Sequence, residues 1–222
     1  MSSALVHFPP LFSAPPRLRV SNAVSRPRTE VAQIHGGGNS STVTSRMTTR
    51  VNGVESLRAA HHAGVAALVA TAREVPEALW NVARPGDKWS PAQIAEHLRL
   101  SYLAGNAELD GGVGLRLRTS FWMRTILRIV YLRKILRTGK IPAGARAPRE
   151  IRPGAGPFSR DATIAAVEAE SVRFENALAT RAPGHALTHH VFGRLDTLRT
   201  WRFMTVHTEH HRRQIEETAA GT

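Results

Sequence analysis

The sequence predicts an all-α protein with one globular domain. Apolar residues recur at helical spacing in successive stretches between residues 53 and 219, whereas no stretch alternates convincingly between apolar and polar residues as a strand would. No internal repeat interrupts this pattern. With 222 residues, 42% of them hydrophobic, the chain is long enough for one sizeable core. These observations favour a bundle of helices.

Two helices are expected in the first half of the domain. Residues 53–74 place their apolar side chains within one sector of a helix, which runs on or resumes through residues 75–82. A second helix is expected over residues 91–109. Ser90 can cap it, Pro91 suits its first position because a missing N–H costs nothing there, and Gln93 completes a capping box.

Three more helices are expected, over residues 115–137, 161–180 and 197–219. The first is rich in arginine, and Trp122, Met123, Ile126, Ile129 and Val130 fall in one sector of it, opposite Arg124 and Arg128. Pro- and Gly-rich segments separate the three helices, and the segment before the last one contains Pro183-Gly184 and Gly193.

The N-terminal segment differs from the rest of the chain. Residues 1–46 are rich in proline, serine and glycine and show no sustained periodicity, so we expect a disordered extension followed by a helical domain over residues 47–222. Translation from Met47 is one explanation of this segment, and an arginine- and serine-rich organelle transit peptide is another. A peptide from residues 1–40 in the native protein would exclude the start at Met47.

Composition restricts the chemistry. The chain has no cysteine, which excludes disulfides, thiolate metal sites and a cysteine nucleophile. No apolar run is long enough to span a bilayer, so we expect a soluble, cytoplasmic protein. The net charge of +13 is local, because residues 111–149 hold ten Lys and Arg and no acid. A surface for nucleic acid or anionic lipid is therefore one hypothesis for residues 115–149, although we expect neither partner, and these arginines could equally bind an anionic substrate.

Three histidines are candidates for a metal site. His207 and His211 lie one turn apart in the last predicted helix, on the side that carries Phe203, Met204 and Ile215. His97 lies at the edge of the apolar face of the 91–109 helix. Three neutral imidazoles would leave one coordination position open on a bound ion, as in catalytic sites. Spacing alone does not bring the two helices together, and the alternative is three histidines hydrogen-bonded to their neighbours.

The chain resembles the DinB/YfiT-like superfamily of helical metalloproteins. The resemblance rests on Trp89-Ser90, Gln93 and His97-Leu98, and on His207, His211 and Gln214-Ile215 near the other end, and it covers about residues 50–219. It implies an up-and-down four-helix bundle in which His97, His207 and His211 hold a divalent metal, with Zn or Ni as the expected ions. It also implies a homodimer, and an exogenous low-molecular-weight thiol as a cosubstrate in some members. Arg213 stands where members often have a small residue.

The function predicted from these features is that of a metal-dependent enzyme, a hydrolase or a thiol S-transferase, in which the metal activates water or an exogenous thiol. The alternative is a binding module whose metal only ties helices together. No general acid or base can be named, since Glu96 is expected to face solvent and Glu108 lies near the core edge. Gln214 could orient a metal ligand or the substrate, and the alternative is a buried glutamine that satisfies a backbone group. The other histidines are not expected to be ligands; these include His61 and His62 in the first helix, and His185, His189 and His190 before the last one.

Overall fold

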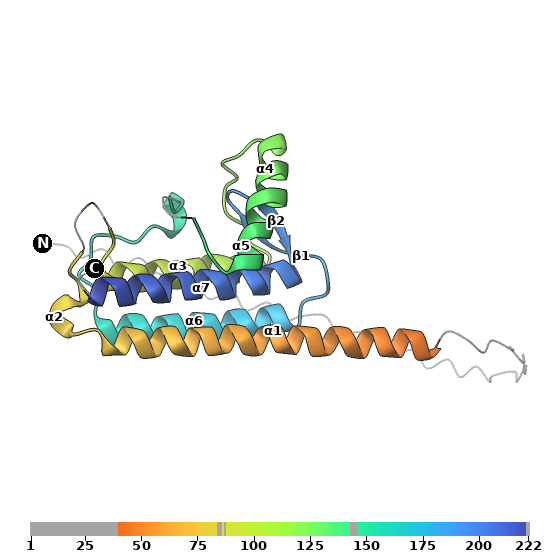
Figure 1. Ribbon diagram of the computed structural model, residues 1–222, viewed down its shortest axis with the longest axis horizontal. Helices are drawn as coiled ribbons and strands as arrows, with labels where there is room; N and C mark the ends of the chain where they lie inside the picture. Colours follow the sequence, from red (N-terminus) through yellow and green to blue (C-terminus); the bar gives the residue numbers. More distant parts are fainter. Residues whose placement is uncertain (1–39, 84–85, 87, 143–145, 221–222) are drawn as a thin grey trace, which may run out of the picture. The chain divides into compact units, whose positions relative to one another are not determined.

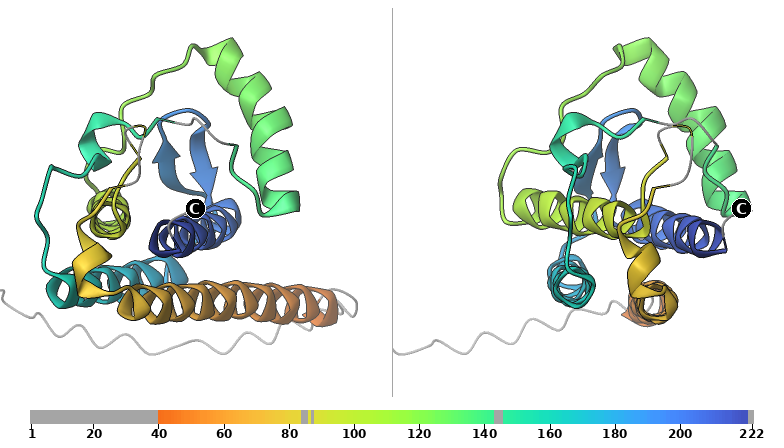
Figure 2. Two further views of the ribbon diagram at one scale, coloured as in Figure 1. Left: turned by 60° about the vertical axis from the view of Figure 1, so that its left-hand side comes forward. Right: turned by 90° about the vertical axis from the view of Figure 1, so that its left-hand side faces the viewer.

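The computed structural model describes residues 40–83, 86, 88–142 and 146–220, with side chains from residue 53 onward. Four long helices dominate this part of the chain: α1 (Ser40–Glu74), α3 (Pro91–Leu109), α6 (Arg160–Ala179) and α7 (Thr197–Ala219). They form two layers, with α3 and α7 over α1 and α6 (Figures 1 and 2). We call these four helices the helical core. The sequence predicted an all-α protein, and the described residues are mostly helical, with one small two-stranded sheet besides.

The boundaries of α3 and α7 agree with the sequence prediction, because both helices carry strong start signals. The hydroxyl of Ser90 accepts a hydrogen bond from the Gln93 amide, and the Gln93 side chain accepts one from the Ser90 amide, which completes the predicted capping box. At α7 the carboxylate of Asp196 accepts from the Arg199 amide at 2.8 Å. These caps fix where the helices that carry His97, His207 and His211 begin.

The first helix is longer than predicted. It begins at Ser40, not at residue 53, and it ends at Glu74, just before the Val75-Pro76 pair where helical geometry is disfavoured. After this break the helical conformation resumes in the short helix α2 (Glu77–Trp80), as expected. The Ser- and Thr-rich start of α1 has low helix propensity, which explains why periodicity did not reveal it. The rest of the extension predicted for residues 1–46 lies outside the described residues.

The prediction that the chain has no strand is wrong. Strands β1 (His185–His189) and β2 (Gly193–Asp196) form an antiparallel hairpin before α7. Gly193, with φ of 72°, starts the second strand in a conformation that favours glycine. Ala186 and Leu195 of the hairpin are buried in the common core. Strands of five and four residues show too few alternations to be recognised, and packing against α3 and α7 stabilises them instead.

The helix predicted over residues 115–137 is observed as a continuous helix over residues 121–138, which we call the outer helix. It comprises α4 (Phe121–Leu127), a π-helical segment η1 (Arg128–Leu132) and α5 (Arg133–Thr138). Its α5 end packs on α7, while α4 stands away from the helical core (Figures 1 and 2). Only Leu132 and Ile135 are buried in it.

The predicted apolar sector of the outer helix does not face the core. Trp122, Met123, Ile126, Ile129 and Val130 are all exposed. The helix meets the core through Leu132 and Ile135, which lie in other sectors, and through the partly buried Leu127. The π-helical turns between Leu127 and Ile135 interrupt the 100° spacing. Among the described helices, none is long and apolar enough to cross a membrane.

Candidate metal centre

The structure brings His97, His207 and His211 together in the helical core. One ring nitrogen from each lies within 4.8 Å of the others. Nε2 of His207 is 3.0 Å from Nε2 of His211 and 3.4 Å from Nε2 of His97. The rings of His97 and His211 have centroids 4.8 Å apart. Two helices that are far apart in sequence, α3 and α7, therefore present three imidazoles to one point.

Hydrogen bonds at the opposite nitrogens orient two of the rings. Nδ1 of His97 lies 2.7 Å from the backbone oxygen of Ile151, in the 3-10 helix η2 (Arg149–Ile151). Nδ1 of His211 lies 2.7 Å from the amide oxygen of Gln214. Since these oxygens only accept, both Nδ1 atoms carry the hydrogen, and each Nε2 of the neutral ring presents a lone pair. Gln214 thus orients the ring of His211 through its side-chain oxygen, a role that the sequence suggested.

The arrangement of lone pairs fits a cation better than a hydrogen-bonded cluster. His207 has only one hydrogen in its neutral form, so its Nε2 cannot donate to both neighbours equally, and its buried Nδ1 has no partner within the described part of the chain. A tetrahedral ion with bonds of about 2.0–2.1 Å to nitrogen would place its ligands about 3.3 Å apart. The two short separations, 3.0 and 3.4 Å, lie close to that value.

Burial keeps the three rings neutral. It lowers the pKa of His97 to about 4. Burial, together with the neighbouring imidazoles, also lowers the pKa of His207 and His211 well below 6.5. The rings are therefore deprotonated at neutral pH, which is the state that metal binding requires.

Aromatic side chains wall the site. The ring of Trp89 lies 5.0 Å from that of His97, and Phe203 stacks on His207 with centroids 5.7 Å apart. Phe203 also meets His189 of the hairpin at 4.8 Å. The hairpin thus contributes to the lining of the site on the His207 side.

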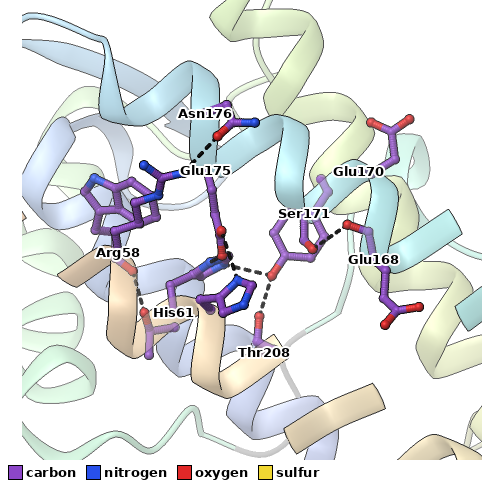
Figure 3. A network of polar contacts seen from close by, with 12 residues as sticks. Arg58, His61, Glu168, Glu170, Ser171, Glu175, Asn176 and Thr208 are labelled. Carbon is purple, nitrogen blue, oxygen red and sulfur yellow. Dashed lines mark hydrogen bonds and ion pairs between the residues drawn. The ribbon is translucent and has the colours of Figure 1, made fainter. Parts of the chain in front are cut away.

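A second polar network joins all four long helices beside the histidines (Figure 3). Nδ1 of the fully buried His61 on α1 donates to Glu175 on α6 at 2.8 Å, and its Nε2 lies 2.9 Å from the hydroxyl of Tyr102 on α3. That hydroxyl is 2.7 Å from the hydroxyl of Thr208 on α7. Because Thr208 follows His207 directly, the network fixes how α7 is turned about its axis, and hence where His207 and His211 point.

The remaining candidates have structural contacts. The expectation that Glu96 faces solvent is wrong. Glu96 is buried, with 9% of its surface exposed, and its carboxylate accepts two hydrogen bonds of 2.7 Å from Arg99. Glu108 accepts from His185 at 3.1 Å and from the amide and hydroxyl of Thr188 at 2.8 and 2.7 Å, which anchors the hairpin on α3.

The other histidines lie outside the cluster, as expected. His62 is exposed and reaches Glu175 at 3.3 Å. Burial lowers the pKa of His189 to about 3, and its Nδ1 accepts from the amides of Val191 and Phe192. Arg213, which replaces the small residue of other members, is exposed and binds Glu209 at 2.9 Å.

Among protein-family models, that of the DinB superfamily matches residues 60–215. This range includes all three histidines of the cluster and all four residues of the polar network. Searches of the curated proteins and of the solved structures gave no significant match.

Proposed function

Because the chain belongs to the DinB superfamily, we propose that it is a metal-dependent enzyme whose ion is held by His97, His207 and His211. The observation that carries this proposal is the convergence of three neutral imidazole nitrogens at separations suited to one ion. Zn²⁺ and Ni²⁺ are the ions that we propose, since both accept imidazole nitrogen readily. The four long helices would form the up-and-down bundle that the resemblance implies, in a homodimer.

Three protein ligands leave a position for a reactant. A bound ion would lower the pKa of water there to about 7, or ionise a thiol, and so supply a nucleophile at neutral pH. The chain has no cysteine, so a sulfur nucleophile would have to be an exogenous low-molecular-weight thiol. The chain's own contribution is to hold the rings through Ile151 and Gln214 and to keep them neutral. We therefore propose hydrolase or thiol S-transferase chemistry.

A catalytic metal fits this chain better than a purely structural one. The helical core has a separate set of fully buried apolar side chains, including Leu68, Trp80, Phe174 and Trp201, and the four-helix polar network besides. These contacts close the core without an ion. Removing the metal with a chelator should abolish the chemistry and leave the helical circular dichroism largely unchanged, whereas cooperative unfolding would favour the structural role.

Cobalt substitution tests whether the site is open. Co²⁺-loaded protein should develop an intense absorption band on addition of 2-mercaptoethanol, because a thiolate would enter the open position. Ethylene glycol is the matched control without sulfur, and the His211→Ala variant the control without the site. A cobalt spectrum that responds neither to thiol nor to a small anion such as azide would show a closed site and contradict the proposal.

A further inference from the structure

The outer helix exposes a large apolar surface. Its exposed apolar side chains are Phe121, Trp122, Met123, Ile126, Ile129, Val130 and Tyr131, and exposure of Trp122 reaches 77%. They are concentrated in α4 and η1, the half that stands away from the helical core (Figures 1 and 2). Scattered exposed apolar residues are ordinary, whereas seven within residues 121–131 of one helix mark an interaction surface.

Contacts at both ends hold this helix in place. Before it, the Arg118 amide donates to the oxygen of His190 at 2.9 Å, and the Thr119 hydroxyl donates to the oxygen of Val191 at 2.9 Å. At its far end, Leu132 and Ile135 are buried and α5 packs on α7. The part of the outer helix that carries the exposed apolar side chains is therefore held in a fixed position.

The charges of the segment that carries this surface have one sign. Residues 111–149 carry ten Lys and Arg and no acid. Arg133, Lys134 and Arg137 in α5 are exposed, as is Lys140 just after it. An exposed set of Trp, Phe and Ile beside a cluster of cations is the composition of helices that bind at the membrane interface. The apolar side chains enter the headgroup region, and the cations meet lipid phosphates.

We propose that the outer helix docks on a membrane surface that contains anionic lipid. Charge argues against a second copy of the chain as the occupant, since two segments that each carry ten cations and no acid would repel each other. Nucleic acid would use the cations but not the exposed Ile, Val and Met side chains. The helix lies on the membrane and does not span it, which accords with the absence of a spanning helix among those described.

Vesicle binding by the full-length chain tests the proposal. The protein should bind vesicles of phosphatidylcholine and phosphatidylglycerol, bind pure phosphatidylcholine much more weakly, and dissociate as salt is raised. Trp122 reports the contact, because Trp80 and Trp201 are fully buried and the partly buried Trp89 packs on His97, away from the outer helix. Its emission should shift to the blue on binding, and the shift should disappear in Trp122→Phe while binding persists.

Matched variants test the apolar and the cationic side chains of the surface separately. Trp122→Ser combined with Ile126→Ser should weaken binding at least about tenfold. Neutralising Arg133 and Arg137 to Gln should weaken it about 30-fold. The controls, which lie outside the surface, are Val172→Ser with Leu198→Ser for exposed apolar residues, and Arg73→Gln with Arg202→Gln for exposed cations. They should leave binding unchanged.

Three results would overturn the proposal. The first is no binding to anionic vesicles. The second is binding to DNA, without vesicle binding, that the Arg133 and Arg137 variant abolishes. The third is a dimer that the Trp122 and Ile126 variant dissociates, again without vesicle binding. Since every substituted residue is exposed, an unchanged circular dichroism spectrum should verify the fold of each variant. Metal content should be the same in all of them, which keeps this test separate from that of the metal centre.

Discussion

Helix α7 and the outer helix are both rich in arginine and apolar residues, but they use them in opposite ways. In α7, Phe203, Met204 and Ile215 are buried against the core. Two of its cations are paired within the helix, since Arg212 and Arg213 bind Glu209 at 2.7 and 2.9 Å. The outer helix exposes its apolar residues, and no acid accompanies its cations. An amphipathic pattern therefore predicts that a helix has an apolar face. What that face packs against depends on the rest of the molecule.

Two tryptophans, one in each region, should give the largest difference in stability. Trp201 of α7 has no exposed surface, whereas Trp122 of the outer helix is 77% exposed. Trp201→Ala should lower the free energy of unfolding by about 3–5 kcal/mol, because it removes buried surface and leaves a cavity. Trp122→Ala should change it by less than about 0.5 kcal/mol. Urea unfolding followed by circular dichroism measures both, and equal losses would place the two regions in one core.

Acid should weaken the helical core of the metal-free protein. The folded His97 ring stays neutral down to a pKa of about 4, whereas the unfolded ring takes up a proton near pH 6.5. Between these values the unfolded state binds more protons, so stability present at neutral pH is lost as the pH falls. From about pH 7 to pH 5 the loss from His97 alone should be about 2 kcal/mol.

Urea unfolding at the two pH values measures this loss, and His97→Gln should reduce it. Residues 111–149 contain no histidine, so Arg133→Gln is the control and should keep the full pH dependence. A free energy of unfolding that does not change between about pH 7 and pH 5 would contradict the buried neutral site.

Substitution of the two tyrosines should also lower the free energy of unfolding more in the helical core than in the outer helix, by a smaller amount than for the tryptophans. Tyr102→Phe removes the hydroxyl that joins His61 to Thr208 and leaves both without that partner in a buried position, which should cost about 1–3 kcal/mol. Tyr131→Phe in the outer helix should be nearly neutral, since Tyr131 is 47% exposed. The comparison uses one chemical change at two sites. If Tyr102→Phe is also neutral, the network does not stabilise the core.

Two serines at helix starts should give the smallest difference. Ser90 caps α3 within a capping box, so Ser90→Ala should cost about 1 kcal/mol. Ser120 stands at the same position before α4 but its side chain makes no capping hydrogen bond. Ser120→Ala should therefore change the free energy of unfolding by only a few tenths of a kcal/mol. Thermal unfolding of the two variants is sensitive enough, and a larger loss for Ser120→Ala would contradict the assignment of the caps.

The sequence predicted best where a local signal and a tertiary contact coincide. The capping residues Ser90 and Gln93 located the start of α3, and the inward sector of α7 placed His207 and His211 on its buried side. The family resemblance then indicated that His97 meets them. Ile151 could not be predicted as a ring-orienting group, because it acts through a backbone oxygen that any residue carries.

The other features that the sequence did not predict also depend on contacts between distant segments. The hairpin over residues 185–196 is stabilised by packing on α3 and α7, which its own short pattern does not reveal. The exposed sector of the outer helix looked like a core face, because periodicity cannot tell which surface covers a helix. Local chemistry thus predicts elements and their faces, and the packing of distant segments decides what each face meets.

The central claim is that one divalent ion binds to His97, His207 and His211. Elemental analysis of the untagged protein tests it most directly, with His97→Ala and His211→Ala as the site variants and His210→Ala as a control beside the cluster. We predict about one ion per chain in the wild-type protein and in the control, and strongly reduced content in both site variants. Unchanged stoichiometry in either site variant would contradict the claim.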